Sequence, residues 1–390
     1  MIFDAAEYRA RLAKTRAGMA REGVDVLVES DPANMFYLTG YDGWSFYIPQ
    51  AVILLLEDSE PLWIGRGLDL NGARRTAFMG HENIMAYPED LFERPDDRHP
   101  MQFVAREIER RGRGRTRIGL ARDCQFFTAR SRDALTASLP NARFVDCDLL
   151  VNRVRLVKSP AEIALMADAS RITERIMAAF FEVVRPGVRE CDAAAEIHKA
   201  QTMGTAEFGG DYPASIPFLA AGPNSATTHL TWSDRRFTDN EVACLQASGV
   251  RHRYHSPMAR TLHLGRPPKR LVEMNDIVLE GMEATLAAAT PGRACEDVEA
   301  VWRGVIARYG LTKESRIAYS VGIGYPPDWG ERTASFRPGD KTVLEPNMTF
   351  HLFLGMWMED WGFAVSETIR ITGTGAEAMA SVPRGLRVKD

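Results

Sequence analysis

The second half of the chain passes twice from helical to β-rich sequence, and this order constrains the fold more than any other feature. Residues 160–203 are mostly helical in character with an interruption at Pro186–Gly187, and residues 208–264 are β-rich and dense in glycine, proline and histidine. Residues 270–309 are helical again, and residues 321–372 return to strands with many aromatic side chains. The pattern predicts a domain of two α/β halves, although the halves share too little sequence to establish a repeat on their own.

A helix-start signal divides the chain just before this region. Ser159 suits the N-cap position, and Glu162 completes a capping box. The preceding sequence has a charged helix at residues 5–22 and then short apolar strands, which indicates a compact α/β domain. The strands are expected at residues 24–28, 51–56 and 61–64, with residues 31–34 closing the first of them. Because 390 residues exceed one ordinary core, we expect an N-terminal domain at 1–157 and a catalytic domain at 158–390.

Composition indicates a globular cytoplasmic protein. Hydrophobic residues make up 45% of the chain and charged residues 26%, and the net charge of −4 argues against nucleic acid or a membrane surface as the main partner. The cysteines lack C-x-x-C spacing and are expected to be reduced thiols rather than a disulfide frame or zinc site: Cys124, Cys147, Cys191, Cys244 and Cys295. We expect no signal peptide and no membrane span, because no segment has the required apolar character.

The segment Gly222–Trp232 resembles the G-x-N…H segment in which the pita-bread metallopeptidases and creatinases place their active-site histidine. This resemblance makes His229 the strongest single candidate for a catalytic residue. An imidazole that titrates near neutrality is a natural proton carrier for opening a C–N bond. The alternative is a core histidine that donates a hydrogen bond to a backbone carbonyl.

A second cluster lies on an expected strand at residues 249–257. Strand alternation puts Arg253 and His255 on one face. Cationic and imidazole groups of this kind can grip a substrate carboxylate, whereas a solvated strand face is the alternative. A zinc site built from His252, His255 and His263 is a further alternative, but it lacks a supporting carboxylate.

Residues 324–331 form a loop that carries an acid and an indole and is stiffened by two prolines. Asp328 and Trp329 suit a stacking or cation–π wall around a small planar cation, while a turn-and-core role is the alternative for Trp329. The same aromatic and acidic character continues toward the last strands, at Trp357, Glu359, Asp360, Trp361 and Glu367.

An aromatic loop in the N-terminal region is a further binding candidate. Gly40 and Gly43 flank Tyr41, and Trp44 and Phe46 follow directly. Loops with conformationally special glycines and exposed aromatic side chains commonly bind ligands.

Over residues 242–261 and 318–372 the chain resembles the pita-bread metallopeptidase and creatinase superfamily, but it lacks the metal ligands of that superfamily. Several segments carry this resemblance: Pro257–Thr261, Val321–Gly324, Met348–Leu354 and Ser366–Thr372. The positions at which the superfamily holds two metal ions are here Gln246, Pro257, Val321, Phe353 and Ser366. Glu367 stands one place beyond the last of them, which in a strand points its side chain to the opposite face. The resemblance therefore implies a site that does not bind metal, because these side chains offer almost no suitable ligands.

Over both domains the chain resembles the ectoine hydrolases, a metal-free branch of this superfamily. The segments that carry this resemblance are Leu38–Phe46, Phe208–Pro213, His229–Trp232, Arg253–Pro257 and Tyr325–Arg332. It implies a creatinase-like mixed-sheet domain, then a pita-bread domain whose pocket opens the cyclic amidine of ectoine to an N-acetyl-2,4-diaminobutyrate without a cofactor. It also implies a homodimer in which one N-terminal domain closes the partner's pocket. The candidate catalytic residues are His229, Gln246, His255 and Glu331, and the candidate substrate-binding residues are Tyr41, Trp44, Phe46, Asp211, Tyr212, Trp232, Arg253, Asp328, Trp329, Glu359, Asp360 and Glu367.

Gln246 departs from the resemblance, which implies a glutamate in a segment similar to F-E-I-A-G. A carboxylate there would be the nucleophile or base, whereas a carboxamide can orient water or substrate but cannot accept a proton. Two alternatives therefore stay open beside ectoine hydrolysis. One is a creatinase-like hydrolase of another amidine or guanidine, and the other is a catalytically impaired binding protein.

Overall fold

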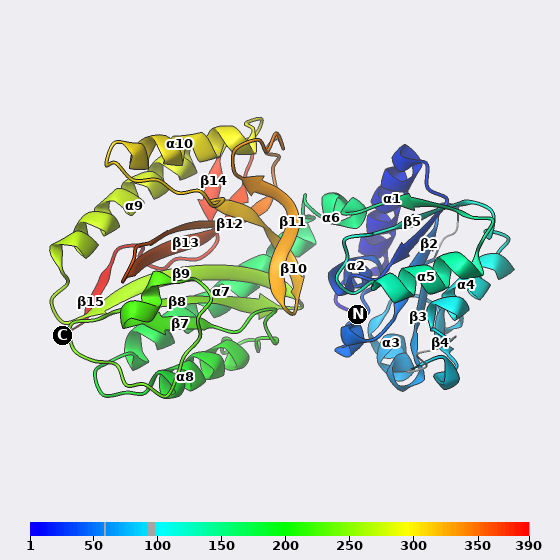
Figure 1. The fold of residues 1–390 in the computed structure, drawn as a ribbon, viewed down its shortest axis with the longest axis horizontal. Coiled ribbons are helices and arrows are strands. Elements are labelled where there is room, and N and C mark those ends of the chain that lie inside the picture. The colour runs from blue at the N-terminus through cyan, green and yellow to red at the C-terminus, as the bar shows by residue number, and fades with distance from the viewer. Residues whose placement is uncertain (58–59, 93–97, 390) are drawn as a thin grey trace. The chain divides into compact units, whose positions relative to one another are not determined.

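The computed structural model describes residues 1–57, 60–92 and 98–389. It divides the chain into two compact units, Met1–Arg155 and Leu156–Asp390 (Figure 1). Each unit has helices, a sheet and its own buried apolar core. Both units thus combine helices with a sheet, as the sequence predicts.

The N-terminal unit is built on a mixed sheet, which in the described residues has six strands in the order β4-β3-β2-β1-β5-β6. Strand β2 runs antiparallel to β1 and β3, whereas β5 is parallel to β1 and β6, and β4 is parallel to β3. Their bounds are β1 Val26–Glu29, β2 Ala51–Leu55, β3 Leu62–Arg66, β4 Ile84–Tyr87, β5 Arg117–Leu120 and β6 Arg143–Asp146. The predicted strands of this unit are therefore present.

Helices of the N-terminal unit begin where local sequence provides caps. Helix α1 (Ala5–Glu22) begins after Asp4, whose side chain accepts from the Glu7 amide, and matches the predicted charged helix. The segment expected to close the first strand instead starts α2 (Pro32–Thr39), because Asp31 caps it by accepting from two backbone amides. The other helices are α3 Leu70–Thr76, α4 Met101–Arg110, α5 Ala129–Ser138 and α6 Leu150–Val154.

The second unit opens on the predicted capping box. The Ser159 hydroxyl accepts from the Glu162 amide at 3.3 Å, and the Glu162 carboxylate accepts from the Ser159 amide at 2.8 Å. The helices of this unit are α7 Pro160–Val183, α8 Glu190–Met203, α9 Lys269–Ala288 and α10 Cys295–Ala307. Across residues 1–57, 60–92 and 98–389, no helix combines the length and apolar character needed to cross a membrane.

A curved, mainly antiparallel sheet forms the centre of the second unit. In the described residues its main path runs β14-β13-β12-β10-β9-β8-β7, with β11 beside β10 and β15 beside β9. The bounds are β7 Phe218–Ala221, β8 Val242–Arg251, β9 Tyr254–Leu264, β10 Ala318–Tyr325, β11 Asp328–Phe336, β12 Thr349–Trp357, β13 Gly362–Ile371, β14 Ala376–Ala378 and β15 Arg387–Lys389.

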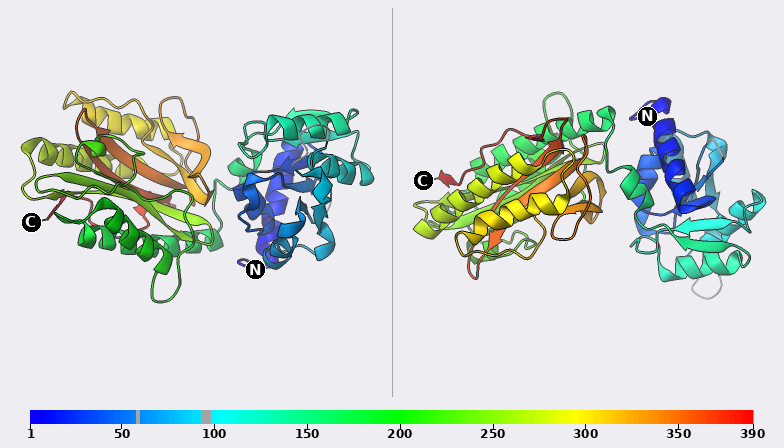
Figure 2. Two further views of the ribbon diagram at one scale, coloured as in Figure 1. Left: turned by 60° about the horizontal axis from the view of Figure 1, so that its bottom comes forward. Right: turned by 90° about the horizontal axis from the view of Figure 1, so that it is seen from above.

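Two helix pairs cover this sheet. Helices α7 and α8 pack with β7, β8 and β9 around one apolar cluster, and α9 and α10 pack with β10 to β13 around another. Figures 1 and 2 show the strands lying between the two pairs. The predicted helix-then-strand order of the two halves thus corresponds to two packed α/β layers.

A tight turn interrupts the strand expected at residues 249–257. His252 and Arg253 have φ values of 47° and 68°, and Arg251 pairs with Tyr254 across the turn. Two successive left-handed residues are the signature of a two-residue hairpin turn. Strand alternation therefore restarts at Tyr254, and the expected shared face of Arg253 and His255 does not exist.

Candidate functional site

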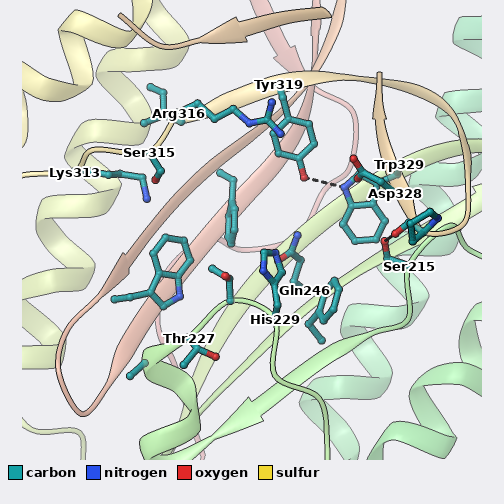
Figure 3. A pocket seen from close by; sticks show the side chains of 17 residues that line it. Ser215, Thr227, His229, Gln246, Lys313, Ser315, Arg316, Tyr319, Asp328 and Trp329 are labelled. Carbon is teal, nitrogen blue, oxygen red and sulfur yellow. Dashed lines mark hydrogen bonds between the residues drawn. The ribbon is translucent and has the colours of Figure 1, made fainter. Parts of the chain in front are cut away.

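The second unit contains a pocket of about 750 Å³ in which side chains from distant segments meet (Figure 3). The pocket lies among the loop after β7, strand β8, the segment from α10 into β10, the β10–β11 turn and strand β12. Its lining consists of Ser215, Phe218, Ala226, Thr227, Thr228, His229, Gln246, Lys313, Ser315, Arg316, Ile317, Tyr319, Pro327, Asp328, Trp329, Phe353 and Trp357.

His229 reaches the pocket from the loop that follows β7. The loop first forms a short 3-10 turn, Gly222–Ala226, in which the Ser225 hydroxyl donates to the Gly222 carbonyl at 2.7 Å. The Gly362 amide in turn donates to the Ser225 hydroxyl, so the turn is tied to the start of β13. The His229 side chain is exposed, with its ring 5.5 Å from that of Phe218. The imidazole can therefore meet both ligand and solvent.

Gln246 enters the pocket from the middle of β8. It pairs with Phe218 on one side and Ala259 on the other, and it is 8% exposed. Within the described residues its carboxamide makes no hydrogen bond, although it lines the pocket. One donor group and one acceptor are therefore left for a ligand or water.

A chain of hydrogen bonds runs from the pocket wall into the sheet. Trp329 Nε1 donates to the Tyr319 hydroxyl at 2.9 Å, and that hydroxyl lies 2.8 Å from His351 Nδ1. His351 Nε2 lies 2.7 Å from the Ser366 hydroxyl, which accepts from the Ala259 amide at 2.6 Å. Tyr319 and His351 are direct cross-strand neighbours on β10 and β12, which explains their contact.

Burial keeps this chain uncharged. It lowers the pKa of His351 to about 3 and raises the pKa of the Tyr319 phenol. A neutral imidazole donates through one nitrogen and accepts through the other. If His351 Nδ1 donates to Tyr319 and Nε2 accepts from Ser366, the Tyr319 hydroxyl hydrogen is left to donate into the pocket. Tyr319 is thus a neutral phenol in the wall, held in place by Trp329 and His351.

Three of the predicted substrate-binding residues and His255 form a structural cluster around the hairpin turn. His255 is fully buried, its Nε2 accepts from the Ala214 amide at 2.9 Å, and its Nδ1 lies 2.8 Å from the Arg253 carbonyl. Burial lowers the pKa of His255 to about 3. Arg253 stacks 3.5 Å from the Tyr212 ring centre and pairs with Asp211 at 3.4 Å.

Two predicted acids lie in buried ion pairs rather than in the pocket lining. Glu331 accepts from Lys158 at 2.7 Å, and both side chains are 1% exposed. Glu367 accepts from Arg260 at 2.7 Å, with exposures of 1% and 0%. Each carboxylate thereby compensates a buried cation.

The remaining predicted residues lie in several places. Asp328 and Trp329 line the pocket, whereas the Trp232 ring packs 5.5 Å from His198 and Asp360 pairs with Arg270 at 3.4 Å on the surface. Glu359 is exposed beside Asp360.

In the N-terminal unit, Tyr41 and Phe46 are 3% and 8% exposed, and Trp44 is 56% exposed. Of these three aromatic side chains, only Trp44 has a surface available for binding.

The residues at the superfamily's metal positions do not fit a divalent metal site. Phe353 pairs directly with Ser366, and Gln246 is one step away, because it pairs with Ala259, whose amide donates to the Ser366 hydroxyl. Only a carboxamide and a hydroxyl carry oxygen among the five side chains, and the hydroxyl is already bonded to Ala259 and His351. Throughout the described part of the chain, no group of three or more His, Cys, Asp or Glu side chains could hold a metal ion.

Lys313, Arg316, Tyr319 and His351 were missed as candidate residues. No motif surrounds Lys313 or Arg316, and only their exit from α10 toward β10 brings them to the pocket. His351 lies inside the segment Met348–Leu354, which resembles the superfamily. The signal that could have identified it is its place two residues before Phe353, a position at which the superfamily has a metal ligand.

The sequence matches two family models and several full-length relatives. The metallopeptidase family M24 model matches residues 164–373, and the creatinase/prolidase N-terminal domain model matches residues 11–157. The chain is 45% identical to an ectoine hydrolase of Halomonas elongata, covering 99% of this chain and 98% of that protein. It is 42% identical to an uncharacterized hydrolase/peptidase of Sinorhizobium fredii, covering 100% and 99% respectively.

Solved structures share the fold at lower identity. The prolidase of Pyrococcus horikoshii superposes with a TM-score of 0.81 at 21% identity, covering 97% of this chain and 99% of that one. An X-Pro aminopeptidase of Thermotoga maritima gives a TM-score of 0.81 at 19% identity, with the same coverage. These likenesses show the fold, and with the two family models they confirm the predicted fold class, a creatinase-like mixed-sheet domain followed by a pita-bread domain.

Proposed function

Because the chain belongs to metallopeptidase family M24 and carries a creatinase/prolidase N-terminal domain, we propose that it is a hydrolase that opens the ring of ectoine or a close cyclic amidine. The product would be an N-acetyl-2,4-diaminobutyrate. The observation that carries the proposal is the 45% identity to an ectoine hydrolase over 99% of this chain. The predicted similarity to that family is confirmed, whereas the reaction of this chain is the proposal.

The pocket chemistry supports a small zwitterion with a planar amidinium ring. Four aromatic side chains line the pocket: Phe218, Trp329, Phe353 and Trp357. Phe218 and Phe353 are partly exposed and can contact a planar cation. Trp329 is 2% exposed, and the Lys313 ammonium already lies over the Trp357 ring. Asp328 supplies a negative charge beside Trp329. The volume of about 750 Å³ accommodates a single-ring substrate together with water.

In the proposed reaction, water adds to the amidinium carbon between the two ring nitrogens. A C–O bond forms, and His229 takes the proton that the water loses. The tetrahedral adduct then collapses: His229 returns the proton to one nitrogen and the bond from carbon to that nitrogen breaks. The hydroxyl proton of the adduct is released as the C=O bond forms, and the freed amine takes it up. One nitrogen leaves as an amine and the other remains in the acetamide. The Tyr319 hydroxyl is a second donor in the same wall.

We further propose that this reaction needs no metal ion. The support is the donor set described above, which lacks the carboxylates and imidazoles of a dinuclear site. An amidinium carbon is already electrophilic, so the substrate supplies the activation that a Lewis acid supplies for a peptide carbonyl.

Gln246 favours one alternative, a protein that binds the amidine and turns it over slowly. Its carboxamide faces the pocket where the resemblance implies a catalytic glutamate. A creatinase-like action on another amidine or guanidine uses the same His229 chemistry and stays a second candidate.

The homodimer implied by the resemblance also stays a proposal. Trp44 and Tyr47 are 56% and 73% exposed on the N-terminal unit and offer an apolar surface for a second copy. Sedimentation of the wild type and a Trp44→Ser, Tyr47→Ser variant tests this proposal, which predicts a dimer for the wild type and weaker association for the variant.

Incubation with ectoine, followed by proton NMR, tests the proposed function. Ring opening should move the methyl resonance from its amidine to its acetamide position. Ectoine that stays intact but binds in calorimetry would instead support the binding-protein alternative. Absence of both binding and turnover would reject ectoine and direct the test to other cyclic amidines and guanidines.

A further inference from the structure

Lys313 and Arg316 form one wall of the pocket and carry two positive charges on the segment that joins α10 to β10. Lys313 is 8% exposed, its Nζ donates to the Gly355 carbonyl at 2.5 Å, and it lies 4.3 Å from the Trp357 ring centre. The Arg316 guanidinium lies 4.3 Å from the Tyr319 ring centre. Within the described residues neither cation has an acidic partner.

This lack of an acid distinguishes Lys313 from the other deeply buried cations of the same unit. Lys158 is paired with Glu331 and Arg260 with Glu367, each at 2.7 Å. The fold thus supplies a carboxylate where it buries a positive charge permanently. At Lys313 it supplies a carbonyl and an aromatic face, and burial lowers the pKa of this lysine to about 8.

Unused donors remain at both side chains. An ammonium has three N–H donors, and Lys313 uses one on Gly355. A guanidinium has five, and Arg316 uses one on the Ser335 hydroxyl at 3.3 Å. Lys313 is buried and Arg316 is exposed, so the free donors of Arg316 can also bond to water. Both side chains have donors left for a negatively charged, acceptor-rich ligand.

We propose that Lys313 and Arg316 bind the carboxylate of the substrate. The identity of the molecule that carries the carboxylate rests on the proposed function. The carboxylate site itself rests on Lys313 and Arg316. Lys313 and Arg316 would each donate a charge-assisted N–H···O bond to the substrate carboxylate. That carboxylate would take the place of the acidic side chain that the described residues do not provide beside Lys313. The role replaces the one expected for Arg253 and His255, which the structure places around the hairpin turn.

The opposite charges of the pocket would also orient a zwitterion. Figure 3 draws Lys313, Ser315 and Arg316 on one side, Asp328 and Trp329 on another, and His229 and Gln246 between them. A carboxylate at the cationic wall leaves the amidinium to the side of Asp328 and Trp329. Reversal of the ligand would set cation against cation and anion against anion.

Calorimetry with two amidines tests the site. The probes are ectoine and its carboxylate-free counterpart, 2-methyl-1,4,5,6-tetrahydropyrimidine. Lys313→Met and Arg316→Gln should each weaken ectoine binding by at least ~10-fold, since hydrogen bonds to charged groups are the stronger ones. Both should change binding of the carboxylate-free amidine by less than about threefold. Lys269→Met is the matched control, because Lys269 is 90% exposed and lies outside the pocket. Equal losses for both probes, or no loss for ectoine, would overturn the proposal.

A second measurement does not depend on ectoine. Reductive methylation uses small neutral reagents, and mass spectrometry follows Lys313 and Lys269 in the same sample. Acetate should slow methylation of Lys313 saturably by about threefold or more, whereas acetamide should not, and Arg316→Gln should abolish the protection. If ectoine does not bind but acetate protects Lys313, the carboxylate site stands and the proposed substrate fails. Equal effects of acetate and acetamide would refute the site even if ectoine is hydrolysed.

Discussion

Replacing Gln246 with glutamate is the change that best separates an enzyme from a binding protein. The side chain lines the pocket, is 8% exposed and makes no hydrogen bond within the described residues, so the substitution breaks no bond. Glutamate has nearly the same shape as glutamine and adds a group that can attack the amidinium carbon or take a proton from water.

The expected gain in turnover is at least ~10²-fold, the lower end for a positioned acid or base. The new carboxylate is partly desolvated, and we expect it to cost about 1–2 kcal/mol of folding free energy in the absence of ligand. For a domain of this size that cost corresponds to a melting temperature lower by roughly 2–8 °C. The amidinium of a bound substrate should recover part of this cost, so ectoine should stabilise the variant more than the wild type.

Proton NMR of ectoine ring opening gives the rates, and calorimetry with and without ectoine gives the stability. Gln246→Met is the matched control, since it keeps the length of the side chain but can act neither as base nor as nucleophile. If the wild type already opens ectoine rapidly and Gln246→Glu abolishes the reaction, the catalytic carboxylate does not belong at this position. In that case a base elsewhere in the pocket, such as His229, must act alone.

Four further expectations follow from the same structure. His229→Ala should lower turnover by about 10²-fold or more with the melting temperature unchanged, and near-wild-type turnover would move the proton carrier to another group such as Tyr319. Dialysed protein should contain well under one transition metal per subunit by elemental analysis and keep its activity with chelators, whereas stoichiometric zinc or manganese at the pocket would contradict metal independence. Acid should weaken the second unit, because its buried His255 and His351 have pKa values of about 3 when folded and near 6.5 when unfolded, so the unfolded state binds more protons between these limits. Calorimetry should show this loss as pH falls below about 6.5, at up to ~1.4 kcal/mol per pH unit for each histidine, and His351→Gln should lower the slope by the share of one histidine. Rising pH should weaken the N-terminal unit instead, because burial raises the pKa of Glu29 from 4.5 to about 8, so the folded state binds more protons than the unfolded state between these values. Calorimetry should show this loss between about pH 4.5 and 8.

The sequence by itself determined the elements whose signals are local. The Ser159–Glu162 capping box and the helix before the first strand depend on residues within a few positions of each other, so their patterns identify them. The order of helices and strands fixed the two α/β halves, and the superfamily frame located His229 and Gln246, both of which line the pocket. One local pattern allowed two interpretations. Asp31–Pro32 can end a strand or start a helix; the sequence predicted the end of a strand, and the structure has the start of α2.

Tertiary structure alone decided which polar groups share the pocket. Lys313, Tyr319 and His351 come from a connecting segment and two strands, and the antiparallel register of β10 and β12 sets Tyr319 against His351. A one-residue change of that register would send these side chains to opposite faces. His255 shows the converse, since it follows a two-residue turn at 252–253, is fully buried and lies outside the pocket lining. Long-range pairing and burial are properties of the folded chain. The residues next to Lys313 in the sequence therefore do not reveal that no acidic side chain lies beside it in the described structure.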